Sequence, residues 1–149
     1  MWILFTGLLL LVDIVTKRWT LNYLSKVNTI PVIKDVFHLT YVENRGVAFG
    51  MFANRQWIVL CFTILAVLGL VIYLVRLPKK QKLLKYTLAM IIAGAIGNII
   101  DRAVYGFVVD MIDVRLINFW VFNFADVCIC VGFALWMIYI LFLEGKQNG

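Results

Sequence analysis

The chain has 149 residues, of which 64% are hydrophobic and only 15% are charged. Soluble domains average about a quarter charged and about half apolar residues, so this composition excludes an ordinary soluble domain. The apolar residues also form long uninterrupted runs, and we predict an integral membrane protein with one domain, residues 1–149.

The net charge of +6 is compatible with either nucleic acid or anionic lipid as a partner. Its placement favours lipid, because five basic residues crowd one short connector between apolar runs: Arg76, Lys79, Lys80, Lys82 and Lys85. A basic cluster beside a membrane span is typical of a cytoplasmic loop that faces anionic headgroups. We therefore predict membrane lipid as a partner and no nucleic acid.

Four apolar runs predict transmembrane helices at about residues 2–19, 57–77, 83–104 and 121–143. About 18 helical residues cover about 27 Å, close to the hydrocarbon thickness of a bilayer. The first run is interrupted by Asp13 and is similar to the apolar part of a secretory signal peptide. No basic residue precedes this run and no small-residue cleavage site closes it, so we expect a retained helix.

The basic connector predicts that both termini are cytoplasmic. A plain count of basic residues disagrees, because more of them then lie outside than inside. The positive-inside rule weights short loops most, and the outer basic residues are spread over longer segments among acidic ones.

In the first predicted helix, Asp13, Thr16 and Lys17 share one face. The simplest interpretation is a carboxylate neutralised by a lysine one turn later, although a supporting role near a site stays open.

Residues 30–54 have a different pattern: Ile30–Ile33 and Val36–Val42 predict two short strands around a tight turn. We expect a small sheet on the outer membrane surface, with His38 exposed on its polar side.

Further along, Asn98, Asp101 and Arg102 lie on one side of the third predicted span. An Asp beside an Arg at the end of a span is often only a salt bridge, whereas a buried amide such as Asn98 needs partners. Gly94 and Gly97 are best interpreted as residues that let helices pack closely.

After Gly106, an apolar segment carries Asp110 and Asp113, and the last span opens with Asn123 and Asp126. Carboxylates beside lipid are costly and need a partner, a water-filled cavity or a function. Asp126 could instead have a purely structural role at the start of the helix. Asn123 can cap this helix, and the helix dipole favours an acidic residue in the first turn.

The sequence argues against the other common types of catalytic site and leaves chemistry based on carboxylates. Ser25 is the only serine and His38 the only histidine, in unrelated contexts, which argues against a serine triad. The sequence contains no zinc-ligand pattern and no glycine-rich phosphate loop, so we predict no metal and no cofactor. Two aspartates within hydrogen-bond reach share a proton and titrate as a pair. One can then act as a general base on water while the other, protonated, polarises a carbonyl.

Five motifs follow one another along the chain: Asp13-x-x-Thr16-Lys17, Asn44-x-Gly46-x-Ala48-Phe49, Gly97-Asn98-x-x-Asp101-Arg102, Val108-Val109-Asp110 and Phe122-Asn123-x-Ala125-Asp126. In order, in spacing and in the four-span layout, this combination resembles the bacterial lipoprotein signal peptidases (signal peptidase II). Thr16 stands where serine is common in that family, and Gly46-Val47-Ala48 varies its glycine–alanine run.

The resemblance implies an aspartic endopeptidase of the bacterial cytoplasmic membrane, with its active site near the outer face. It would cut the signal peptide of a prolipoprotein immediately before a cysteine that already carries a diacylglyceryl group. The catalytic pair would be Asp110 and Asp126, while Asn98 and Arg102 would hold the substrate backbone. The remaining motif positions around the site would be Asp13, Lys17, Asn44, Gly46, Asp101 and Asn123.

The fold expected from the resemblance is mainly α-helical, with four transmembrane helices and a small extracytoplasmic β-sheet between the first two. A mobile segment, around residues 105–120, would lie between the last two helices. We expect a monomer without a cofactor, and we assign no role to Asp113.

Two rival functions remain open. A small transporter could use intramembrane carboxylates as proton relays, but it predicts acids in mid-span rather than at span ends. A non-catalytic scaffold would explain the small-residue packing but leaves Asp110 and Asp126 without a purpose. Both rivals predict that replacing either aspartate does not affect peptide cleavage.

Overall fold

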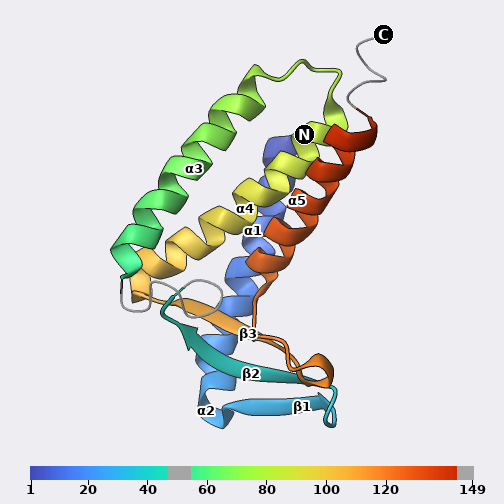
Figure 1. The fold of residues 1–149 in the computed structure, drawn as a ribbon. Coiled ribbons are helices and arrows are strands. Elements are labelled where there is room, and N and C mark those ends of the chain that lie inside the picture. Colours follow the sequence, from blue (N-terminus) through green and yellow to red (C-terminus); the bar gives the residue numbers. More distant parts are fainter. Residues whose placement is uncertain (47–54, 144–149) are drawn as a thin grey trace.

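The computed structural model describes residues 1–46 and 55–143. Four long helices form a bundle: α1 (Trp2–Trp19), α3 (Gln56–Arg76), α4 (Lys82–Tyr105) and α5 (Phe124–Phe142). Helix α4 is central, since α1, α3 and α5 all pack against it. A small sheet closes one end of the bundle (Figure 1), and the helices begin and end close to their predicted bounds.

Three of the helices in the described part of the chain are long and apolar enough to cross a membrane: α3, α4 and α5. The first helix has a similar length but carries Asp13, Lys17 and Arg18. Asp13 and Lys17 are buried inside the protein, so their charges do not face lipid. That α1 is a fourth span therefore stays a prediction.

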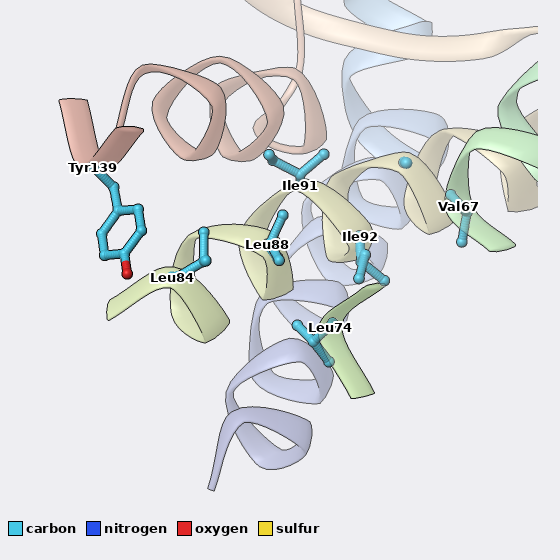
Figure 2. Close-up of a cluster of buried hydrophobic side chains, with 8 residues drawn as sticks. Val67, Leu74, Leu84, Leu88, Ile91, Ile92 and Tyr139 are labelled. Atoms are coloured by element: carbon cyan, nitrogen blue, oxygen red, sulfur yellow. The ribbon is translucent and has the colours of Figure 1, made fainter. Parts of the chain in front are cut away.

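The apolar core of the bundle joins α3, α4 and α5 (Figure 2). It consists of Val67, Leu74, Leu84, Leu88, Ile91, Ile92, Ala95 and Tyr139. Close packing beside this core depends on glycine, because a Cβ atom at Gly94 would overlap the carbonyl oxygen of Ala125 on α5. This overlap confirms the packing interpretation of Gly94.

The sheet has three antiparallel strands in the order β1 (Thr29–Ile33), β2 (Phe37–Asn44) and β3 (Val108–Val114). The predicted hairpin is confirmed, with Asp35 at a positive φ of 60° in its turn. A π-helical segment (Thr20–Leu24) and the short α2 (Ser25–Val27) lead from α1 into the sheet. Leu24 then packs against Val109 and Met111 of β3.

Strand β3 was not predicted, and it comes from the segment that we expected to be mobile. The sheet is therefore not confined to the chain between the first two helices: β2 is its middle strand. Four successive residues of β3, from Val108 to Met111, are buried, which removes the alternation that identifies a half-exposed strand. Of the predicted sheet region, residues 47–54 lie outside the described part.

The prediction of an exposed His38 is wrong. Its relative exposure is 6%, because β1 and β3 flank β2 and Asp113 lies directly opposite on β3. Among the described residues, neither ring nitrogen of His38 has a hydrogen-bond partner. A single strand pattern could not reveal this burial, which depends on the strand that arrives from between α4 and α5.

Candidate active site

The two candidate catalytic aspartates reach the same place from different elements. Asp110 lies on β3, and Asp126 lies in the first turn of α5. Helix α5 begins at a capping box: Asn123 Oδ1 accepts the Asp126 N–H at 3.0 Å, and Asp126 Oδ2 accepts the Asn123 N–H at 3.2 Å. The structural role expected for Asp126 is thus present, and its second oxygen is left for other contacts.

Two amides connect the two carboxylates. Asn123 Nδ2 donates to Asp110 Oδ1 at 2.6 Å, and Asn98 Nδ2 donates to Asp126 Oδ1 at 2.8 Å. The amides also contact each other, with 3.2 Å between Asn123 Nδ2 and Asn98 Oδ1. Asn44 Nδ2 donates to the other Asp110 oxygen at 2.9 Å. The orientation of each carboxylate is therefore fixed by hydrogen bonds, and the two are linked through Asn98 and Asn123.

The environment of Asp110 favours its protonated form. Its relative exposure is 1%, and burial, with a further contribution from the charge of Asp126, raises its pKa to about 7. Hydrogen bonds from Asn44 and Asn123 and the charge of Lys17 act in the opposite direction. A carboxyl group with such a pKa can hold or release a proton near neutral pH.

A buried ion cluster lies behind the dyad. Lys17 Nζ lies 2.9 Å from Asp13 Oδ2, 3.1 Å from Asp101 Oδ2 and 2.9 Å from Asn98 Oδ1. The predicted Asp13–Lys17 pair is confirmed, and Lys17 also orients the amide that holds Asp126. The expected alternative for Asp101, a salt bridge to Arg102, is not what the structure contains, because Asp101 pairs with Lys17.

The two acids of this cluster also hold backbone. Asp13 Oδ1 accepts the N–H of Ala125 at the start of α5, at 2.9 Å, and Asp101 Oδ2 accepts the N–H of Val109 on β3, at 3.0 Å. Gly97 lies against this cluster, because a Cβ atom there would overlap Asp13 Oδ2. Helices α1 and α4 therefore fix the positions of the two segments that carry Asp110 and Asp126.

Arg102 extends the site towards α3. It donates to the carbonyl of Gly46 at 3.1 Å, to Gln56 Oε1 at 3.2 Å and to the carbonyl of Asn98 at 3.4 Å. The Gly46 N–H in turn donates to Asn44 Oδ1 at 3.1 Å. Beside Arg102 lies a cavity of about 260 Å³, lined by Arg45, Gln56, Trp57, Leu60, Arg102 and Gly106.

Every residue expected at the site takes part in this network: Asp13, Lys17, Asn44, Gly46, Asn98, Asp101, Arg102, Asp110, Asn123 and Asp126. Ala48 and Phe49, which also belong to the motifs, lie outside the described residues. Sequence reasoning missed Gln56 and Trp57, which open an apolar helix and look like ordinary interfacial residues. Within the part that the structure describes, His, Cys, Asp and Glu form no group of three or more that could hold a metal ion.

Comparison with known proteins finds matches along almost the whole chain. The family model described as signal peptidase (SPase) II matches residues 5–142. The lipoprotein signal peptidase of Clostridioides difficile (strain 630) is 48% identical over 149 residues, which cover 99% of each chain. That of Brevibacillus brevis (strain 47) is 42% identical over 145 residues, 97% of each chain.

Two solved structures, each described as a bacterial membrane enzyme, have the same fold. One has a TM-score of 0.87 and 28% identity, covering 99% of this chain and 90% of its own. The other has a TM-score of 0.86 and 28% identity, covering 96% and 94%. With the family match across almost the whole length, these findings show that the chain belongs to the signal peptidase II family.

Proposed function

We propose that this protein is an aspartic lipoprotein signal peptidase. Its substrates are diacylglyceryl-modified prolipoproteins, and it cuts immediately N-terminal to the lipidated cysteine. The observation that supports this proposal most directly is the pair of carboxylates, Asp110 and Asp126, joined through the amides of Asn98 and Asn123.

In the proposed reaction, Asp110 holds the proton of the dyad, because its pKa is raised to about 7. Asp126 takes a proton from a water molecule, whose oxygen attacks the scissile carbonyl carbon. Asp110 donates its proton to the carbonyl oxygen and so stabilises the tetrahedral intermediate. The C–N bond then breaks, the leaving amine takes the proton from Asp126, and Asp110 regains its own as the carbonyl re-forms.

Arg102 and Asn98 are proposed to hold the substrate backbone. Arg102 donates to two main-chain carbonyls of this chain, those of Gly46 and Asn98, which supports this role. Acyl chains of the substrate would remain in lipid beside the apolar helices, away from the reacting bond. Binding energy from such remote groups can fix the position of the scissile peptide.

The layout also supports the proposed orientation. The start of α1, the basic α3–α4 connector and the end of α5 lie at one end of the bundle, while the sheet lies at the other (Figure 1). A cytoplasmic connector would place both termini inside the cell and the dyad near the outer face of the cytoplasmic membrane.

The test uses the purified full chain in lipid or detergent, with a diacylglyceryl-modified prolipoprotein and its unmodified form. We expect cleavage of the modified form only, and loss of cleavage in Asp110→Asn and in Asp126→Asn. Asp35→Asn is the matched control, because Asp35 is exposed and its positive φ also suits asparagine. If either dyad variant cleaves at close to the wild-type rate, the aspartic mechanism is wrong and a relay or scaffold function has to be considered.

A further inference from the structure

The pairing of β2 with β3 changes register by one residue in the middle of the strands. Leu39 lies opposite Ile112, whereas Val42 lies opposite Asp110. Two residues of β2, Thr40 and Tyr41, therefore face the single residue between them on β3. This is a β-bulge, a feature that is frequent beside active sites because it redirects the side chains that follow it.

The bulge decides which face of the sheet Asn44 occupies. With the bulge, Asn44 lies opposite Val108, two residues from Asp110, so that Asn44 and Asp110 project from the same face. If the register at Leu39 continued unchanged, Asn44 would lie opposite Phe107 and project from the other face. The 2.9 Å hydrogen bond from Asn44 to Asp110 therefore requires the extra residue.

A second cross-strand contact lies at the first residue of the bulge, on the opposite face from Asp110. Thr40 Oγ1 donates to Asp113 Oδ2 at 2.6 Å, and Arg115 Nε lies 2.9 Å from the same oxygen. Thr40 Oγ1 also lies 2.9 Å from Thr29 Oγ1 of β1. Burial alone would raise the pKa of Asp113, but the bonds from Thr40 and Arg115 lower it, so the acceptor is charged at neutral pH.

We propose that Thr40 and Asp113 are positioning residues for the catalytic dyad. Their hydrogen bond fixes the bulge between Leu39 and Val42, and the bulge brings the Asn44 amide onto Asp110. This inference rests on the proposed function only in taking Asp110 as catalytic. Asp113, to which the sequence motifs give no role, thereby acts on Asp110 through the register of the strand that carries both.

The register can be measured without any activity assay. The experiment starts from the full chain without its native cysteines (Cys61→Ala, Cys128→Ala, Cys130→Ala). In this background, Asn44→Cys combined with Val108→Cys reports the bulged register. The other pair reports the unbulged register, Asn44→Cys with Phe107→Cys. We expect oxidation to cross-link the first pair and not the second.

Adding Thr40→Val, which keeps the side-chain shape but removes the donor, should shift cross-linking towards the second pair. We expect the ratio of the two cross-linking yields to change at least about tenfold, as for the loss of one hydrogen bond to a charged acceptor. Thr40→Ser should restore the original ratio. Thr63→Val is the matched control, because the Thr63 hydroxyl donates within α3, to the carbonyl of Val59 at 2.7 Å, and has no other hydrogen bond among the described residues.

Kinetics then test the link to the dyad. Thr40→Val should lower kcat between about 10- and 100-fold, with a smaller effect on KM, as expected for a misplaced catalytic group. Asn44→Ala should do the same, and both should move the alkaline limb of the pH profile upwards, because the amide that lowers the pKa of Asp110 is lost. Combined with Asn44→Ala, Thr40→Val should have no further effect on kcat.

An unchanged cross-linking ratio in Thr40→Val would overturn the inference, whatever the activity. So would kcat losses that multiply in the double variant, because Thr40 would then act independently of Asn44. Failure of the proposed function is a separate result: if Asp110→Asn still cleaves, the dyad assignment fails, while the cross-links still report whether Thr40 sets the register.

Discussion

Asn123 offers a sharp test of the site, because its side chain serves both the fold and the dyad. Its oxygen caps α5 through the Asp126 N–H, and its Nδ2 donates to Asp110 at 2.6 Å. The residue is fully buried, with a relative exposure of 0%. Two substitutions separate the two roles: Asn123→Ser retains a capping oxygen but has no amide to donate, and Asn123→Ala has neither.

The magnitudes follow from these contacts. Loss of the cap in Asn123→Ala should cost about 1 kcal/mol of folding free energy. Loss of the bond to Asp110 should add about 1–3 kcal/mol, because a buried carboxyl oxygen is left without a hydrogen-bond donor. Asn123→Ser should keep the cap and so should lose only the stability that the bond to Asp110 provides. Both variants should lower kcat about 100-fold, the effect typical of removing one preorganised donor from an active site.

The assays are thermal unfolding in detergent and cleavage of a lipidated prolipoprotein. We expect the unfolding midpoint to fall in the order wild type, Asn123→Ser, Asn123→Ala, while the two variants have similar kcat. Equal stability of the two variants would refute the capping argument. A wild-type kcat in Asn123→Ser would refute the claim that the amide serves the dyad.

Three further predictions concern the dyad, the ion cluster and the helix packing. As a general acid, Asp110 must be protonated, and its pKa is raised to about 7. The value of kcat/KM should therefore fall as pH rises through about 7. A kcat/KM that stays constant between pH ~6 and ~9 would contradict this role. Lys17→Met should destabilise the protein by about 3–5 kcal/mol, because it leaves two buried carboxylates without their counter-ion, whereas the exposed Lys34→Met should not change the unfolding midpoint. Gly97→Ala should lower both stability and cleavage because its methyl group would displace a carboxylate of the ion cluster, and Gly69→Ala, where nothing lies within 4 Å, should leave both unchanged.

Some features of this protein could be predicted from its sequence because each depends on residues close together in the chain. Long apolar runs predict membrane helices, and alternation over residues 37–41 predicts β2. The cap at Asn123 and the Asp13–Lys17 pair follow from spacings within one helical turn. The motif residues could be named from the resemblance, although their contacts could not.

Only the tertiary structure decided how these pieces meet. Strand β3 pairs with a strand more than 60 residues earlier in the chain. Successive residues on both faces of β3 are buried, so its sequence lacks the alternation of apolar and polar residues that identifies a strand. That pairing buries His38 and places Asp113 against Thr40. The sharing of Lys17 between Asp13 and Asp101, and the contacts of Arg102 with Gly46 and Gln56, likewise join distant segments. A one-residue bulge then sets the face on which Asn44 meets Asp110, because side chains alternate along a strand and every shift by one residue reverses them.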